Sequence, residues 1–150
     1  MLTTAGELKI ADFGTARNID RVEMTFRRCT PAYSAPEVYL NDEWDALEGK
    51  YTEKCDVFSA GYILYEMLTS EQLNKAVSTH DGLKKFLKIC KVRGGFELDH
   101  PSLTGRWRDL LTLMLSFRPD QRPAFPIIRK VLSEFAEGTN QRSQLRPTQP

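Results

Sequence analysis

A strongly apolar stretch occupies residues 55–68, where ten of fourteen residues are apolar. The apolar positions fall on every side of a helical wheel, as in a helix that is surrounded by protein. The stretch is too short to span a bilayer. Thr52 can cap this helix, and Asp56 places negative charge in the first turn, where the helix dipole favours it. The pattern therefore predicts a buried central helix over residues 52–69, and an ordinary amphipathic helix with a wide apolar face is the alternative.

A second helix is predicted from the apolar spacing of residues 83–90, with Asp81 as its cap. The opposite face of this helix carries four lysines, which are Lys84, Lys85, Lys88 and Lys91. These lysines form either a solvated helix surface or a docking patch for a partner.

Two amphipathic helices follow towards the C-terminus. The first covers residues 107–115 and ends before Pro119, because the residue preceding a proline disfavours the α conformation. The second covers residues 127–135 and closes at Gly138, which suits the position after a helix end. The polar remainder, residues 138–150, is expected to be a disordered tail.

The N-terminal part has shorter elements. Residues 8–11 are predicted to form a short strand that stops at Asp12-Phe13-Gly14, and an acid at a strand end is well placed to hold a metal ion. Residues 15–34 show no sustained period and are predicted to be a long loop, a type that tends to be functional or disordered. A short helix begins at Pro36, since a first-turn proline loses no hydrogen bond.

Composition limits the class of protein. With 150 residues and 41% apolar content, the chain can bury one core of ordinary size. Its 21 basic and 20 acidic residues create no overall positive field for nucleic acid or an acidic membrane. Three widely spaced cysteines are most simply reduced thiols, and the N-terminus resembles no secretory signal. We therefore expect an intracellular protein, cytoplasmic or nuclear.

Four segments, taken in order, resemble the C-terminal lobe of a eukaryotic protein kinase. They are LKIADFG at residues 8–14, TPAYSAPE at 30–37, DVFSAG at 56–61 and RPAF at 122–125. Each is weak alone, whereas the ordered set is specific. The RPAF segment resembles Ser/Thr kinases of the tyrosine-kinase-like branch. The resemblance implies a mainly α fold over residues 1–137, the helical C-terminal lobe of the protein-kinase fold, with a short N-terminal β strand and no N-terminal β lobe.

The resemblance also implies roles for single residues near the N-terminus. Asp12 would chelate the Mg²⁺ that bridges the β- and γ-phosphates of ATP. Phe13 would pack inward, and Gly14 would let the backbone turn. The alternative is that Asp12 merely ends a strand.

The next segment resembles the activation segment of the family. Thr30 and Tyr33 would lie in the substrate-facing loop, in a pattern similar to that of Ser/Thr-specific members. Thr25 would be a regulatory phosphorylation site whose added charge Arg27 and Arg28 could pair, and an ordinary loop hydroxyl is the alternative.

Three further residues have structural roles in the resemblance. Glu37 would pair with Arg122, which ties the activation segment to the base of the lobe. Asp56 would hold the backbone of the catalytic loop.

The sequence contains no counterpart of several parts of a kinase. These are the Gly-rich loop, the phosphate-pairing lysine and its helical glutamate partner, and the catalytic loop with its base Asp and second metal-binding Asn. LTTAGELKIADFG resembles the stretch directly after that Asn. We therefore expect the chain alone to be inactive and to bind neither ATP nor Mg²⁺ tightly, although the intact parent would use both.

Three interpretations follow. The chain is a fragment of a full-length kinase, or a binding module that regulates an intact kinase through its lysine face and activation segment, or a half that needs a separately encoded N-terminal half. Its partners would be protein substrates or regulatory proteins.

Overall fold

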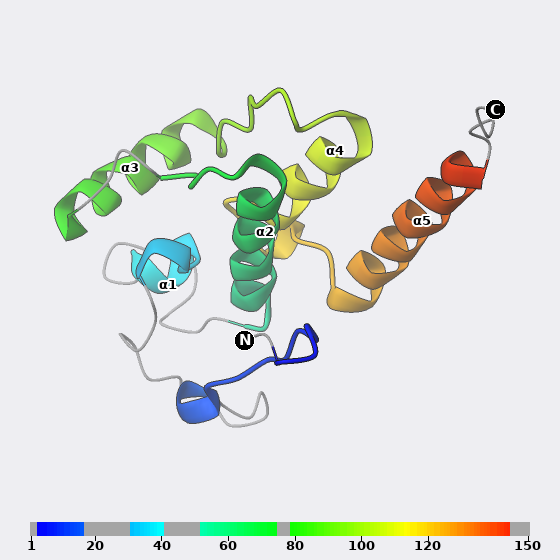
Figure 1. Cartoon of the computed structure of the whole chain (residues 1–150). Helices are drawn as coiled ribbons and strands as arrows, with labels where there is room; N and C mark the ends of the chain where they lie inside the picture. Colours follow the sequence, from blue (N-terminus) through cyan, green and yellow to red (C-terminus); the bar gives the residue numbers. More distant parts are fainter. Residues whose placement is uncertain (1–2, 17–30, 41–51, 75–78, 145–150) are drawn as a thin grey trace.

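A computed structural model of the chain describes residues 3–16, 31–40, 52–74 and 79–144 (Figure 1). The helices in chain order, with η denoting a 3₁₀-helix, are η1 (Phe13–Thr15), η2 (Pro31–Tyr33), α1 (Pro36–Tyr39), α2 (Lys54–Thr69), α3 (His80–Arg93), α4 (Gly105–Met114), η4 (Pro119–Gln121) and α5 (Phe125–Gln144). The mainly helical fold class is confirmed, and no sheet occurs in the described ranges. No helix among these residues is long and apolar enough to cross a membrane.

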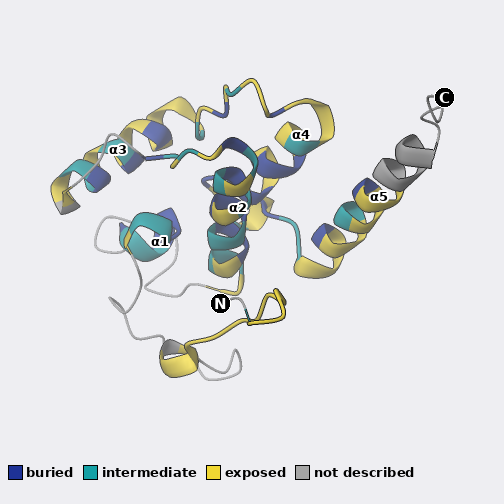
Figure 2. Ribbon diagram, viewed as in Figure 1, coloured by how far each residue is buried: buried dark blue, intermediate teal, exposed yellow. Residues whose placement is uncertain are grey.

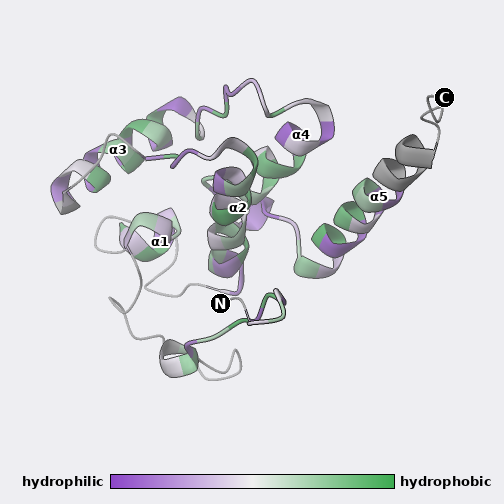
Figure 3. Cartoon of the chain, in the orientation of Figure 1, coloured by the Kyte–Doolittle hydropathy of each residue, from purple (hydrophilic) through white to green (hydrophobic). Residues whose placement is uncertain are grey.

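The predicted strand at residues 8–11 is wrong in this chain. Leu8 makes one isolated β-bridge, and the residues after it are irregular. A strand is stable only when a neighbouring strand pairs its backbone, and the described part of the chain offers none here. Leu8 and Ile10 are 77% and 85% exposed. Figures 2 and 3 show this N-terminal segment as exposed although part of it is hydrophobic.

Helix α2 stands at the centre of the fold and contacts α4, η2 and η4. It begins at Lys54, and its backbone N–H there donates to the Thr52 hydroxyl at 3.4 Å, so Thr52 lies two residues before the helix. Its buried residues include Val57, Phe58, Gly61, Tyr62 and Tyr65.

The outer side of α2 is not covered by the described residues. Ile63 and Met67 are 49% and 73% exposed, and Asp56 is exposed in the first turn of the helix. The prediction that this helix is surrounded by protein on every side is therefore wrong for this chain, whereas the alternative of an amphipathic helix with a wide apolar face fits it. The apolar face is wide because it packs against several elements at once.

Three apolar clusters form the core. The first joins α2 to α4 and to the segment between α3 and α4, through Phe58, Tyr62, Leu103 and Leu111 among others. The second joins α1 to α3, and the third joins α2 and α4 to α5. Phe96 connects the first two clusters, because its ring lies 5.4 Å from that of Phe58 and 6.1 Å from that of Phe86.

Two helix ends differ from expectation. Thr79 caps α3, accepting a hydrogen bond from the Gly82 N–H at 3.1 Å, so Asp81 lies in the first turn instead. A Thr side chain in extended backbone conformation is as suitable a cap as an Asp, and sequence spacing alone does not choose between them.

Helix α5 continues through Gly138 to Gln144, so part of the expected disordered tail is helical. Glycine inside a helix costs only about 1 kcal/mol relative to alanine. The first proline beyond it is Pro147, so no strong helix breaker intervenes.

Replacing Gly61 by alanine is expected to destabilise the fold. An added Cβ would lie 2.9 Å from Cβ of Met114 and 3.4 Å from the Leu115 side chain, where α2 packs against α4. Overpacking typically costs about 1–3 kcal/mol, which outweighs the gain in helix propensity of about 1 kcal/mol. Urea unfolding measures the change. Gly95→Ala is the control, because its Cβ would meet nothing within 4 Å; equal stability of the two variants would contradict this account of the packing.

Candidate functional site

The Arg122 side chain forms a bidentate ion pair with Glu37, although 85 residues separate them. Nη1 donates to Oε1 of Glu37 at 2.6 Å, and Nη2 donates to Oε2 at 2.8 Å. Arg122 is 2% exposed and Glu37 is 3% exposed. The parallel geometry is the strong form of this contact, because both carboxylate oxygens receive a charged donor.

The other donors of Arg122 bind backbone carbonyls. Nε donates to Ser116 O at 2.8 Å, Nη1 to Lys54 O at 2.9 Å and Nη2 to Phe117 O at 3.3 Å. In return, Lys54 Nζ donates to Arg122 O at 2.9 Å, and the guanidinium lies 5.0 Å from the centre of the Phe58 ring. The charge is therefore fully compensated, and α1, the start of α2 and the segment before α5 are joined at one point.

The loop at η2 is attached to α2 by side chains. Ser59 Oγ donates to Tyr33 O at 2.9 Å, and Tyr33 OH donates to Glu66 Oε2 at 2.9 Å. The rings of Tyr33 and Tyr62 meet edge to face with centres 4.9 Å apart. Both ends of Tyr33, its carbonyl and its hydroxyl, are thus fixed to one face of α2.

Asn74 completes this attachment. The Tyr62 hydroxyl donates to Asn74 Oδ1 and accepts a hydrogen bond from the Asn74 backbone N–H at 3.1 Å, and Asn74 Nδ2 donates to Ala32 O at 3.5 Å. Sequence reasoning missed Ser59, Glu66 and Asn74. The one available signal was Glu66, an acid inside an apolar helical stretch.

Two tyrosine hydroxyls and one thiol near this loop have raised pKa values. The hydrogen bond to the Glu66 carboxylate, with burial second, raises the pKa of Tyr33. Burial raises the pKa of Tyr62 to about 12, and burial with the neighbouring Asp56 charge raises that of Cys55 to about 12. Each of these groups is therefore protonated at neutral pH, and Cys55 is no nucleophile.

Asp12 has an unusual backbone conformation. Its φ of 64° and ψ of 67° lie in the left-handed region, which few residues other than glycine adopt and which often marks functional sites. An added Cβ on Gly14 would lie 3.3 Å from Oδ1 of Asp12, so the glycine leaves room for the carboxylate. Asp12 is exposed and can supply one hard oxygen ligand, as Mg²⁺ requires when phosphates provide the others.

The remaining predicted residues are placed as follows. Phe13 is 69% exposed, so the expected inward packing is wrong in this chain, because the described residues provide no apolar surface around it. Asp56 is exposed at the start of α2, where it accepts a weak hydrogen bond from the Cys55 thiol at 3.9 Å. Thr25 and Thr30 lie outside the described residues and stay predictions. No group of three potential metal ligands gathers in the part that is described.

Comparison with known proteins identifies the family. The family described as protein kinase domain matches residues 1–134. Serine/threonine-protein kinase ATG1 of Eremothecium gossypii is 38% identical over 79% of the chain, and mitogen-activated protein kinase kinase kinase 7 of Drosophila melanogaster is 35% identical over 91%. Human mitogen-activated protein kinase 12 is 45% identical over 55% of the chain.

The chain belongs to the protein kinase family, as the resemblance predicted. It spans 11%, 19% and 21% of the lengths of the ATG1, kinase kinase kinase 7 and kinase 12 relatives, respectively. The matched region contains Asp12, the η2 loop and both members of the Glu37–Arg122 pair.

Removing Arg122 is expected to destabilise the fold strongly. Arg122→Ala leaves the buried Glu37 carboxylate unpaired, which typically costs about 3–5 kcal/mol. Arg122→Lys should also lower stability, since an ammonium group cannot form the bidentate contact. Thermal and urea unfolding measure both. The control is Arg118→Ala, whose ion pair with Asp120 is exposed and whose loss should have little effect. An unchanged melting temperature for Arg122→Ala would refute the structural role.

Alkaline pH should weaken the fold through Tyr62. An unfolded tyrosine has a pKa of about 10, and burial raises that of Tyr62 to about 12. Its contribution to the free energy of unfolding is therefore complete below pH 10 and is lost as the pH rises through about 12. The difference in stability between the wild type and Tyr62→Phe should shrink over this range by at most about 1.4 kcal/mol per pH unit.

Guanidinium unfolding at several pH values between 9 and 11 measures this effect. Burial also raises the pKa values of the thiols Cys55 and Cys90. Their contributions cancel when the free energy of unfolding of Tyr62→Phe is subtracted from that of the wild type. Parallel stability curves for the wild type and Tyr62→Phe would show that Tyr62 does not titrate as described.

Proposed function

We propose that this chain is the C-terminal-lobe portion of an ATP-dependent kinase that phosphorylates Ser or Thr residues of proteins. The observation that carries the proposal is the attachment of the η2 loop to α2. By resemblance this loop faces the protein substrate, and it is fixed at Ala32 and Tyr33 by Ser59, Glu66 and Asn74. Phosphoryl transfer depends on positioning, so a rigid substrate-facing loop supports this function.

Asp12 would hold the metal ion in the intact kinase. When bound, Mg²⁺ neutralises charge on the β- and γ-phosphates. The Asp12 side chain is accessible, its left-handed backbone places the carboxylate over Gly14, and any side chain at Gly14 would crowd it. Asp12, Phe13 and Gly14 would thus make up the contribution of this chain to the nucleotide site.

The chain alone should not transfer phosphate. Its 150 residues contain no counterpart of the catalytic loop or of the lysine that pairs the phosphates. Loss of a general base costs about 10²–10⁴ in rate. A single carboxylate cannot position ATP by itself, since effective catalysis requires the reacting groups to be held together.

A non-catalytic binding module is the second candidate. The outer face of α2 favours it, because Ile63 and Met67 are exposed there beside Asp56. Exposed apolar surface on a folded protein is typical of an interaction site. Such a module would bind an intact kinase or its substrates.

A chimera tests the catalytic proposal. Residues 1–134 replace the matching segment of the Eremothecium gossypii ATG1 kinase, and transfer of labelled phosphate to a generic protein substrate is measured. The chimera should phosphorylate Ser and Thr, and Asp12→Asn should reduce the rate by about 10²-fold or more, as expected when a metal ligand worth several kcal/mol is lost. Asp99→Asn, an exposed acid in the segment between α3 and α4, is the matched control.

The 150-residue chain, assayed alone, should show no transfer above its Asp12→Asn variant. Transfer that persists in the chain alone and disappears in Asp12→Asn would overturn the proposed inactivity. A folded chimera that binds ATP but does not phosphorylate protein would overturn the catalytic proposal and favour the binding module.

A further inference from the structure

Asn74 is a buried polar residue in the segment that follows helix α2. The left-handed conformation of Ser70, with a φ of 57°, ends α2 and turns the chain, so that the next residues run back along the helix. Asn74 therefore lies beside Tyr62, and the two residues are only 6% and 3% exposed. A buried side-chain amide is costly unless other groups satisfy its donor and its acceptor, so the partners of Asn74 indicate what it does.

The orientation of the Asn74 side chain follows from these partners. Its Oδ1 accepts a hydrogen bond from the Tyr62 hydroxyl, which itself accepts one from the Asn74 backbone N–H at 3.1 Å. Its Nδ2 donates to Ala32 O at 3.5 Å. The opposite orientation of the amide would place Oδ1 against the Ala32 carbonyl oxygen, and neither of these atoms can donate. The Tyr62 hydroxyl therefore holds the amide in the orientation that gives the η2 loop a donor.

The hydrogen bond to Ala32 O adds a constraint that helix α2 does not supply. Ser59 and Glu66 of α2 both contact Tyr33, the first at its carbonyl oxygen and the second at its hydroxyl, each at 2.9 Å. Ala32 O belongs to the peptide group before the Tyr33 Cα atom, and Tyr33 O belongs to the peptide group after it. Because peptide groups are planar, holding both of them leaves little freedom in the φ and ψ angles of Tyr33. Asn74 and Ser59 together thus set the backbone conformation of the loop.

We propose that Asn74 is a positioning residue of the η2 loop, which acts through Ala32 O and determines how tightly the kinase binds its protein substrate. Tyr62 supports this role, because its hydroxyl orients the Asn74 amide. The inference rests on the proposed function in one respect, namely that the η2 loop faces the protein substrate. The hydrogen bonds of both side chains go to each other and to the loop, not to the segment Asp12–Gly14, so the nucleotide site should not depend on them.

Amide hydrogen exchange in the full 150-residue chain measures the loop directly. The Ser34 N–H, which is hydrogen-bonded within the η2 loop, reports on the loop, and the Leu115 N–H, which is bonded to the last turn of α4, reports on the core. Asn74→Leu, which keeps the number of side-chain atoms but removes the amide, should speed exchange at Ser34 relative to Leu115 by about fivefold or more, because the loop opens locally. Tyr62→Phe should act in the same direction with a smaller effect.

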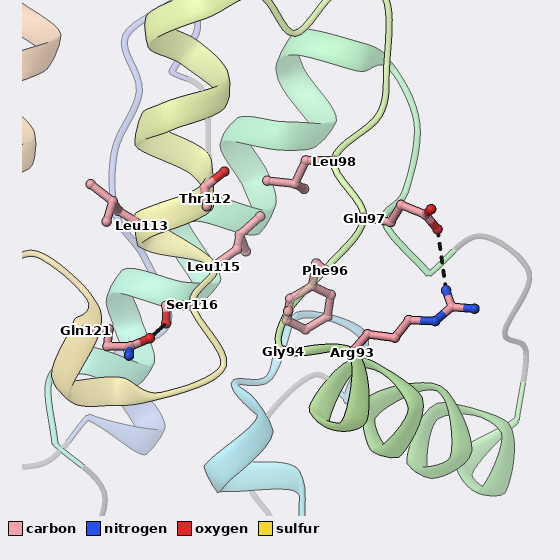
Figure 4. A pocket seen from close by; sticks show the side chains of 11 residues that line it. Arg93, Gly94, Phe96, Glu97, Leu98, Thr112, Leu113, Leu115, Ser116 and Gln121 are labelled. Atoms are coloured by element: carbon pink, nitrogen blue, oxygen red, sulfur yellow. Dashed lines mark hydrogen bonds and ion pairs between the residues drawn. The ribbon is translucent and has the colours of Figure 1, made fainter.

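Two control variants separate this effect from general destabilisation. Gln121 also accepts a hydrogen bond from a hydroxyl, that of Ser116 at 2.8 Å, but it lies at the cavity of about 690 Å³ between α3 and α4, whose lining includes no residue of the η2 loop (Figure 4). Gln121→Leu should therefore leave exchange at Ser34 unchanged. Ile128→Val weakens the buried third cluster without touching the loop, so it should not change the ratio of exchange at Ser34 to that at Leu115.

The chimera with the ATG1 kinase measures the effect on substrate binding. Asn74→Leu should raise the KM for the protein substrate by about fivefold or more, while kcat and the KM for ATP change less than about twofold, as expected when an interaction made equally in the ground and transition states is lost. A merely structural role would lower the amount of active enzyme, which reduces kcat and leaves both KM values unchanged. Tyr62→Phe should show the same pattern more weakly, and Gln121→Leu should show none of it.

Two results would overturn the proposal. One is an unchanged ratio of exchange at Ser34 to that at Leu115 in folded Asn74→Leu, and the other is a loss in the chimera that appears in kcat while both KM values stay the same. Circular dichroism shows whether each variant is folded, and Tyr62→Phe tests the same contact if Asn74→Leu does not fold. A chimera that phosphorylates no protein would overturn the proposed function, whereas unchanged exchange at Ser34 would overturn the role of Asn74, so the two failures are distinguishable.

Discussion

The buried ion pair between Glu37 and Arg122 is the constraint on which the rest of the fold depends. Removing two charges from water is costly, and only a complete set of partners offsets that cost. Arg122 has such a set, because its donors bind Glu37 and three backbone carbonyls. Since those carbonyls lie before α5 and at the start of α2, the pair fixes α1 relative to both. The η2 loop directly precedes α1, so its position follows from the same contact.

Much of this arrangement could be predicted from the sequence. The apolar period located α3, α4 and α5, and the strongly apolar stretch located α2, because each of these helices buries a continuous face. Pro36 marked α1 for a local reason, its missing N–H. The pairing of Glu37 with Arg122 could be inferred only from the family resemblance, since no local pattern connects residues 85 positions apart. Local sequence patterns therefore predicted the helices, whereas only the family resemblance predicted the long-range contact between Glu37 and Arg122.

The parts that could not be predicted depend on neighbours or on near-equal local choices. Residues 8–11 have the composition of a strand, but a strand forms only with a partner, and Phe13 packs inward only against a surface. Thr79 and Asp81 are both good caps, so the start of α3 was ambiguous by one or two residues. The contacts of Glu66 and Asn74 with the η2 loop could not be predicted, because no sequence pattern indicates that these segments lie side by side.

Two sides of α2 differ in how far other residues of the described chain cover them. Ser59, Tyr62 and Glu66 lie on one side at helical spacing. Ser59 and Glu66 hydrogen-bond Tyr33 of the η2 loop, and the Tyr62 ring packs against that of Tyr33. Asp56, Ile63 and Met67 share another side and remain exposed. Gly61 faces α4, and because it has no side chain the two helices can pack closely there. The contacts that hold the η2 loop are therefore made within this chain. A protein surface that covered the exposed side of α2 would leave these contacts intact.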